Sequence, residues 1–106
     1  MIYDMRIYDL KPGSVPAYLE AVREVALPVR ERYGIKLAGW YYTEVGPLNR
    51  VVHIWAYRDW AHLAEGKEQF RSDPQWVRDY VPRVQPLIVR QQTQIMRSPD
   101  FAPQPA

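Results

Sequence analysis

The residues with the clearest chemical potential lie in residues 38–59, where a carboxylate and an imidazole stand among aromatic side chains. Glu44 precedes an expected turn, His53 follows it, and Arg6 lies in a β-like run near the start of the chain. An imidazole can act as a general base, and a guanidinium can hold an anionic oxygen. The candidate catalytic residues are His53, Arg6 and Glu44. The candidate ligand-binding residues are Tyr8, Trp40, Tyr42, Trp55 and Tyr57, with the Tyr42 and Tyr57 hydroxyls as hydrogen-bond donors.

Each of these residues also has a structural interpretation. A buried pair of Arg6 and Glu44 is often only structural, and a single histidine in a sheet is more often packed in a core or interface than catalytic. The aromatic side chains are equally suited to packing. This alternative is a noncatalytic dimer or interaction module, and it predicts no cavity of roughly 300 Å³ or more beside His53.

Other kinds of site find little support in the sequence. The chain has no cysteine, which removes disulfides, thiolate catalysis and zinc sites with sulfur ligands. His53 and His62 are not spaced as a zinc pair, and His62 is expected to face solvent in the first turn of a helix. No glycine-rich phosphate loop or G-x-S-x-G elbow is present. We predict no metal and no cofactor, with haem bound through either histidine as the alternative.

The composition indicates one globular domain. The 106 residues are 47% hydrophobic and 25% charged, which are ordinary values for a folded domain of this size. The net charge of +2, without basic runs, argues against a nucleic-acid partner. No apolar run approaches the roughly 20 residues that span a bilayer, and the start resembles neither a secretory signal nor a transit segment. A soluble, cytoplasmic protein that binds no membrane is expected.

Hydrophobic periodicity predicts strands alternating with helices. Asp59 and Asp73 are suited to helix N-caps, and Gly34 to the position after a helix. Pro28 lies inside the first helical pattern and predicts a kink in the turn before it. The predicted elements are a strand over residues 2–10, a helix over 15–33, strands over 35–45 and 51–58, helices beginning at 60 and 74, and a strand over 87–96.

This order predicts an α+β, ferredoxin-like β-α-β-β-α-β fold, with two helices on one face of a four-stranded antiparallel sheet. It forms a single domain over residues 2–97, followed by a loose tail over 98–106. The second and third strands are apolar on both faces, which predicts a homodimer that packs sheet against sheet. A turn over residues 46–49 would place Tyr42 opposite His53 and Trp40 opposite Trp55, with Glu44 on the same face.

The sequence resembles the NIPSNAP domain over residues 2–97. The resemblance is carried by "MRIYDLKPG", "LAGWYYTEVGPLNRVVHIWAYRD" and "DPQWVRDYVPRVQPLIVRQQTQIM". It implies the dimeric α+β barrel, a fold shared by cofactor-independent monooxygenases, haem-degrading enzymes and isomerases, and it implies no settled activity. The positions that match the family's pattern are Arg6, Tyr8, Trp40, Glu44, Gly46, Asn49, His53, Trp55 and Tyr57, of which Gly46 and Asn49 suit the turn.

The function predicted from the sequence is the binding of a small aromatic or apolar molecule between the sheet and the helices of a homodimeric protein. The reaction expected there is a cofactor-independent oxygenation or a proton transfer, with His53 as the base and Arg6 holding an anionic oxygen. The alternative is the noncatalytic module without a ligand pocket.

Overall fold

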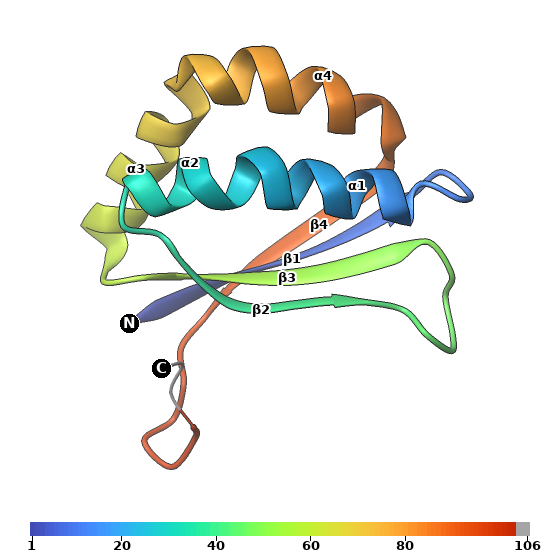
Figure 1. Cartoon of the computed structure of the whole chain (residues 1–106). Coiled ribbons are helices and arrows are strands. Elements are labelled where there is room, and N and C mark those ends of the chain that lie inside the picture. Colours follow the sequence, from blue (N-terminus) through green and yellow to red (C-terminus); the bar gives the residue numbers. More distant parts are fainter. Residues whose placement is uncertain (104–106) are drawn as a thin grey trace.

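The computed structural model describes residues 1–103, and its elements follow the predicted β-α-β-β-α-β order. A layer of helices covers one face of a four-stranded antiparallel sheet (Figure 1). The strands are β1 (Ile2–Leu10), β2 (Lys36–Tyr42), β3 (Arg50–Tyr57) and β4 (Ile88–Met96). The helical segments are α1 (Val15–Ala21), the π-helical turn η1 (Val22–Ala26), α2 (Leu27–Arg32), α3 (Trp60–Ser72), the π-helical turn η2 (Trp76–Tyr80), α4 (Val81–Val84) and the 3-10 turn η3 (Gln85–Leu87).

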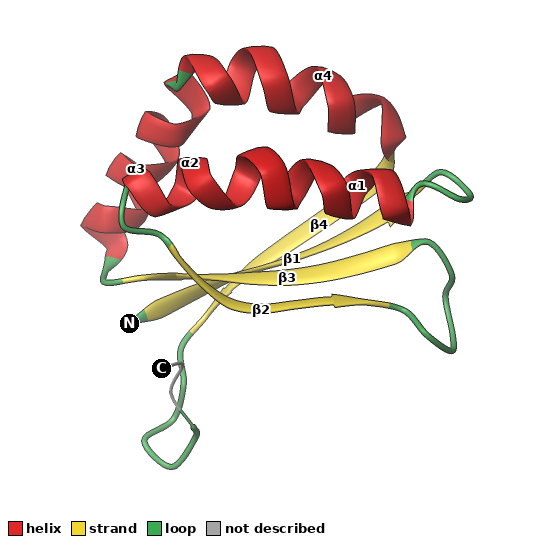
Figure 2. Ribbon diagram, viewed as in Figure 1, coloured by secondary structure: helices red, strands yellow, loops and turns green. Residues whose placement is uncertain are grey.

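The strand order β2-β3-β1-β4 puts β1 and β3 at the centre of the sheet (Figure 2). Arg6 of β1 lies opposite His53 of β3 and opposite Thr93 of β4. Since opposite residues share a face, these side chains point to the same side of the sheet. The predicted α+β, ferredoxin-like fold is confirmed, and it brings Arg6 and His53 together from distant parts of the sequence.

The two long helical segments contain matching irregularities. In the first, the Leu27 N–H donates to the Val22 carbonyl five residues earlier, and Pro28 follows at once. In the second, the Val81 N–H donates to the Trp76 carbonyl and Pro82 follows. A proline has no N–H and cannot continue the normal ladder, so the wide turn accommodates it without ending the helix. The irregularity predicted before Pro28 is therefore a π-helical turn.

The β2–β3 hairpin differs from the prediction in its register. β2 ends at Tyr42, the connecting loop spans residues 43–49, and the Thr43 N–H donates to the Arg50 carbonyl at 3.1 Å. Trp40 therefore lies opposite His53, and Tyr42 lies opposite Val51. The predicted turn over residues 46–49 is too short by several residues. A slip of two residues keeps Trp40 and Tyr42 on their predicted face but removes Glu44 from the sheet. The irregularity between Leu37 and Gly39 places Leu37 opposite Trp55.

The core lies between the helices and the sheet. Its most buried members come from the first helical run and from β3, which shows that these two elements carry most of the packing. Complete burial of one such apolar side chain stabilises the fold by roughly 1.5–3 kcal/mol. The most buried residues of the core include Tyr18, Ala21, Ala26, Val29, Val51, Trp55 and Tyr57. Within residues 1–103 we find no helix with both the length and the apolar character needed to cross a membrane.

Asp59 caps α3 as predicted, since its Oδ1 accepts the His62 N–H at 2.8 Å. The expectation that His62 faces solvent is wrong, because its side chain is buried. The His62 Nδ1 accepts the Arg58 N–H at 3.1 Å, and its Nε2 donates to the Tyr33 carbonyl at 2.9 Å. Both ring nitrogens thus bond the main chain, and neither is free to bind a haem iron.

Replacing the cap tests its contribution to stability. Asp59→Ala is expected to lower the free energy of unfolding by about 1 kcal/mol, because the His62 N–H loses its acceptor. Urea denaturation measures the change. Glu65→Ala, at an exposed position of the same helix, is the control and should stay within about 0.5 kcal/mol of the parent. Equal losses in the two variants would show that Asp59 does not act as a cap.

Candidate functional site

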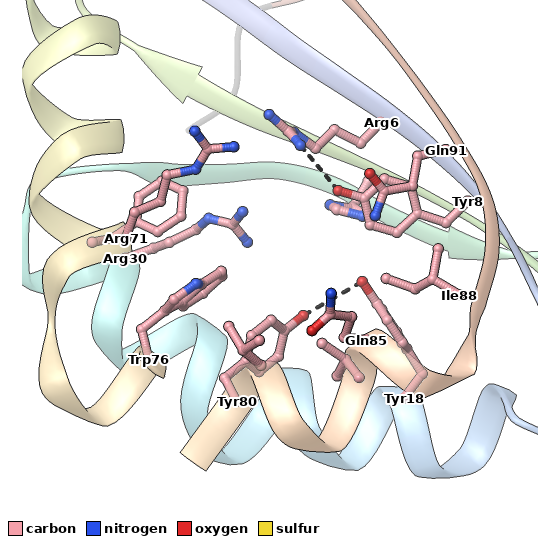
Figure 3. A pocket seen from close by; sticks show the side chains of 14 residues that line it. Arg6, Tyr8, Tyr18, Arg30, Arg71, Trp76, Tyr80, Gln85, Ile88 and Gln91 are labelled. Atoms are coloured by element: carbon pink, nitrogen blue, oxygen red, sulfur yellow. Dashed lines mark hydrogen bonds between the residues drawn. The ribbon is translucent and has the colours of Figure 1, made fainter. Parts of the chain in front are cut away.

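A cavity of about 390 Å³ lies between the helical layer and the sheet (Figure 3). Its floor is made by side chains of β1, β3 and β4, and its walls come from α1, α2, α3 and the segment from η2 to η3. The lining mixes aromatic rings with arginine, glutamine and tyrosine side chains. This composition of an apolar wall with a few convergent polar groups is typical of a small-molecule site.

Arg30 of α2 reaches this cavity from within the core. Its guanidinium carbon lies 3.9 Å from the centroid of the Trp55 ring, 4.8 Å from Phe70 and 5.0 Å from Trp76. The residue is only 5% exposed, and its Nε has no hydrogen-bond partner. No carboxylate within residues 1–103 forms an ion pair with it. Burial lowers the pKa of Arg30, but a guanidinium stays protonated near neutral pH.

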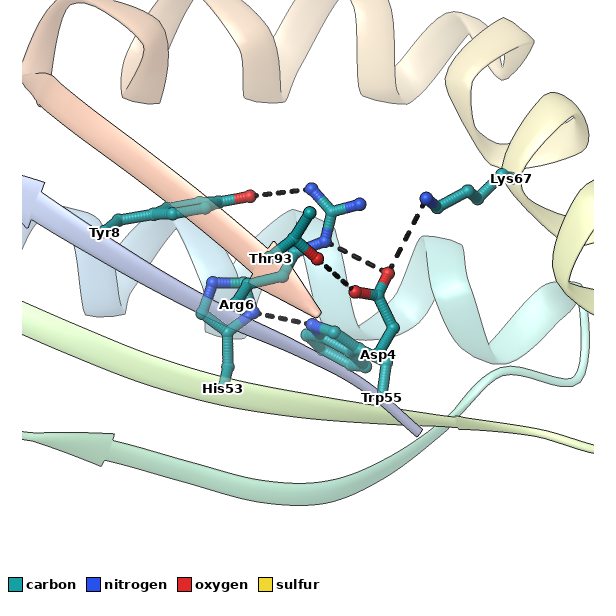
Figure 4. Close-up of polar contacts among 7 residues, drawn as sticks. All are labelled: Asp4, Arg6, Tyr8, His53, Trp55, Lys67 and Thr93. Atoms are coloured by element: carbon teal, nitrogen blue, oxygen red, sulfur yellow. Dashed lines mark hydrogen bonds and ion pairs between the residues drawn. The ribbon is translucent and has the colours of Figure 1, made fainter. Parts of the chain in front are cut away.

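Arg6 of β1 is a second cation at the cavity, and it is held in place (Figure 4). Its Nε donates to Asp4 Oδ2 at 3.1 Å and its Nη1 donates to the Tyr8 hydroxyl at 3.0 Å. The buried Asp4 also accepts a hydrogen bond from Thr93 at 2.7 Å and lies 3.8 Å from the Lys67 ammonium. Burial alone would lower the pKa of Arg6, but its contacts with Tyr8 and Asp4 outweigh burial and raise it.

His53 of β3 lies among three aromatic rings. Trp40 stacks on the imidazole at 5.3 Å between centroids with an interplanar angle of 11°, and Tyr8 meets it edge-on at 4.9 Å. The indole Nε1–H of Trp55 donates to His53 Nδ1 at 2.6 Å (Figure 4). An indole N–H can only donate, so His53 Nδ1 must present its lone pair.

The contact with Trp55 therefore determines the protonation of His53. In the neutral imidazole the proton resides on Nε2, which is buried and has no partner among the described residues. Burial, followed by the charges of Arg30 and Arg6, holds the pKa of His53 well below its usual value. His53 is thus a neutral hydrogen-bond donor at Nε2. This geometry argues against the predicted role as a base, because neither nitrogen has a free lone pair.

A second polar group lies in the helical wall. The Tyr80 hydroxyl of η2 donates to the Tyr18 hydroxyl of α1 at 3.4 Å, and both side chains are buried. Burial raises the pKa of each phenol, so both remain protonated near neutral pH. Gln85 of η3 lies beside this pair (Figure 3).

The structure brings together only part of the predicted site. Arg6, Tyr8 and His53 line the cavity, while Trp40 and Trp55 contact His53 from the side. The other three predicted residues lie elsewhere. Tyr57 is buried against His62 with 5.4 Å between ring centroids, Tyr42 is 54% exposed at the end of β2, and Glu44 is exposed in the hairpin loop. The expected position of Glu44 beside His53 is wrong because the strand ends before reaching it.

Sequence reasoning missed the residues that the helices contribute, Arg30 above all. A signal for it was present, since Arg30 stands four residues after Ala26 and three before Tyr33, both assigned to the apolar face of the helix. A cation within an apolar stripe is a pattern that indicates a buried charge. Tyr18, Trp76 and Tyr80 carried no separate signal, because aromatic residues at helical spacing ordinarily fill a core.

Comparison with known proteins confirms the predicted resemblance. The NIPSNAP family model matches residues 3–103. Protein NipSnap homolog 3B from Homo sapiens is 29% identical over 93 residues, which are 88% of this chain and 37% of that protein. Protein NipSnap from Drosophila melanogaster is 28% identical over 102 residues, which are 96% of this chain and 36% of that protein. The chain thus spans little more than a third of the length of these curated relatives.

Solved structures share both the fold and the sequence pattern. A NIPSNAP family protein of unknown function from Agrobacterium tumefaciens is 34% identical with a TM-score of 0.89, and the match covers 97% of this chain and 92% of that one. A NIPSNAP domain protein from Burkholderia xenovorans is 33% identical with a TM-score of 0.88, over 98% and 100% of the two chains. A putative antibiotic biosynthesis monooxygenase from Nitrosomonas europaea is 17% identical with a TM-score of 0.71, over 92% and 98%, and this likeness shows the fold alone.

The buried neutral His53 predicts a specific dependence of stability on pH. Because its pKa is lower in the folded chain than in the unfolded one, its contribution to stability is complete above about pH 6.5 and is lost as the pH falls toward the folded-state pKa. Urea denaturation should show this loss, with a slope of up to about 1.4 kcal/mol per pH unit from this one group. His53→Asn keeps an acceptor for Trp55 but cannot titrate, so its profile should be flatter below pH 6.5. Parallel profiles would contradict the assignment.

Proposed function

The chain belongs to the NIPSNAP family, and we propose that its cavity binds a small organic anion with an aromatic or apolar body. The observation that carries the proposal is Arg30, a buried guanidinium that pairs with no carboxylate in the described part of the chain. Bidentate recognition by arginine is well suited to a carboxylate. The anionic group of the ligand would then supply the counter-ion that the protein lacks.

The energetic argument rests on the cost of burying a charge. Taking an ion out of water costs several kcal/mol unless it is paired and hydrogen-bonded. The three rings around Arg30 offset part of this cost, at about 0.5–2 kcal/mol for each cation–π contact. They leave the Nε–H of the guanidinium without an acceptor. A carboxylate in the cavity would satisfy both the charge and the donors.

The size of the cavity supports the same proposal. Its volume of about 390 Å³ exceeds the lower limit of roughly 300 Å³ for ligand pockets. The noncatalytic alternative predicted no such space beside His53, yet His53 lines the cavity. Phe70, Trp76 and Ile88 provide apolar surface for the body of a ligand.

The polar groups of the cavity favour binding of an anion over proton abstraction. Arg6 and Arg30 are cations, and His53 Nε2–H is a donor. Among the described residues that line the cavity there is no aspartate or glutamate. Such donors stabilise an oxyanion, whether a carboxylate, an enolate or a phenolate. Catalysis of a proton transfer or an oxygenation stays a prediction, since the shared fold of a putative monooxygenase brings no residue roles with it.

We also propose that the sheet face opposite the helices packs against the same face of a second copy. Met5, Ile7, Val52 and Ile54 are only half-buried on this face, and Tyr41 beside them is 60% exposed. They form a continuous apolar area, because Met5 lies opposite Ile54 and Ile7 lies opposite Val52. An apolar patch of this kind is typical of an interaction surface, and a twofold dimer is the simplest closed arrangement.

Replacing Arg30 tests the proposed anion site. Phenylacetate is the probe, and isothermal titration calorimetry measures its affinity for the full chain. Arg30→Met is expected to weaken binding at least about tenfold, which corresponds to the loss of one charge-assisted pair. Arg83→Met is the matched control, because Arg83 pairs with Glu24 at the surface at 2.8 Å and should leave the affinity unchanged. Equal affinity of wild type and Arg30→Met would reject Arg30 as the anion-binding group.

Light scattering at micromolar concentration tests the dimer. The expected mass is twice the 12.5 kDa of the chain. Ile54→Lys introduces a charge into the apolar area and should shift the mass toward that of one chain. Gln69→Lys, at an exposed position of α3 on the helical side of the sheet, is the control and should leave the mass unchanged. Circular dichroism checks that both variants are folded. A wild-type mass of a single chain would reject the proposal.

A further inference from the structure

The cavity has a second polar end that the anion does not use. We propose that its ligand is a hydroxyaryl carboxylic acid, with the carboxylate at Arg30 and Arg6 and the hydroxyl at the Tyr18–Tyr80 pair. This inference rests on the proposed anion site and names the chemical class of its ligand.

The two ends of the cavity come from different parts of the fold. Figure 3 shows Arg30 and Arg71 on one side, whereas Tyr18, Tyr80 and Gln85 gather on the helical wall away from them. The first group is cationic and the second is neutral. A ligand that contacts both groups therefore carries its charge at one end and an uncharged polar group at the other.

The tyrosine pair is suited to a hydroxyl group. The Tyr80 hydroxyl donates a hydrogen bond to the Tyr18 hydroxyl at 3.4 Å. The Tyr18 O–H therefore remains available to donate to another acceptor. A ligand hydroxyl can accept from Tyr18 and donate to the side-chain oxygen of Gln85, which lines the cavity beside the pair. Burial raises the pKa of both phenols, so the pair is uncharged near neutral pH.

The space between the two ends is suited to a flat ring. Trp76 lies 4.7 Å from Phe70 and 4.3 Å from Tyr80 between ring centroids, which forms an aromatic wall. Val84 and Ile88 continue the apolar surface. The cavity of about 390 Å³ is larger than the ~150 Å³ that accommodates benzene alone, which leaves room for a polar group at each end of the ring.

A ligand without the hydroxyl would leave the tyrosine pair desolvated. Sites that hydrogen-bond a hydroxyl reject the analogue that lacks it more strongly than apolar pockets reject a missing methylene. We therefore expect 4-hydroxyphenylacetate to bind at least about tenfold more tightly than phenylacetate. The neutral 4-hydroxyphenylethanol should bind more weakly than the hydroxylated acid by a similar factor, because it offers no charge to Arg30.

Calorimetric titration of the full chain with these three probes tests the inference. The double variant Tyr18→Phe and Tyr80→Phe keeps both rings, and it should reduce the preference for the hydroxylated acid over phenylacetate to within about twofold. Tyr33→Phe is the control, since the Tyr33 hydroxyl bonds Asp73 at 2.7 Å away from the cavity lining, and it should retain the preference.

The outcomes separate the two proposals. Equal affinity of wild type for the two acids, or a preference that survives in the double variant, overturns the hydroxyl site and leaves the anion site standing. Binding of 4-hydroxyphenylethanol as tight as that of the hydroxylated acid overturns the anion site alone. If neither acid binds, both proposals fall.

Discussion

The guanidinium of Arg30 is buried among the rings of Trp55, Phe70 and Trp76, and no carboxylate of the described chain stands beside it. The π-helical turn before Pro28 keeps the helix continuous and lets Arg30 follow Val29 into the interior. Rings from β3, α3 and η2 surround the charge, so both layers of the fold contribute to its environment. The cavity is the space that this unpaired charge faces.

Arg6 is half-buried and Arg30 is buried, and their different partners assign their roles. Arg6 is bonded to Asp4 and Tyr8, and Asp4 is in turn held by Thr93 and Lys67. These contacts hold the Arg6 guanidinium in place, which makes Arg6 a fixed part of the floor. Arg30 lies against three aromatic rings, and its Nε–H has no acceptor. His53 adds a third donor because Trp55 occupies its Nδ1. These three side chains thus present donors to the cavity.

Much of the fold could be predicted from local patterns. The alternation in β1 and β3 gave the correct faces, and Asp59 and Asp73 cap helices as expected, the latter through a 2.9 Å bond from the Gln75 N–H. The predicted hairpin register was wrong because a loop of residues 43–49 has no strong length signal, and a slip of two residues leaves Trp40 and Tyr42 on the same face. Arg30 was not predicted as a site residue, because charged residues of an amphipathic helix are usually assigned to its solvent-exposed face. Tertiary packing decides which helix residues lie opposite which sheet residues across the cavity, and hydrophobic periodicity does not predict this.

The most direct measurement of the role of Arg30 is the free energy of unfolding of Arg30→Met in the absence of any ligand. If Arg30 binds an anionic ligand and does not stabilise the ligand-free fold, methionine of similar length removes an uncompensated buried charge. The variant should then be at least as stable as wild type. If Arg30 instead stabilises the fold through its aromatic contacts, the variant should lose more than about 2 kcal/mol. That loss would contradict the interpretation of Arg30 as a buried charge whose counter-ion is supplied by a ligand.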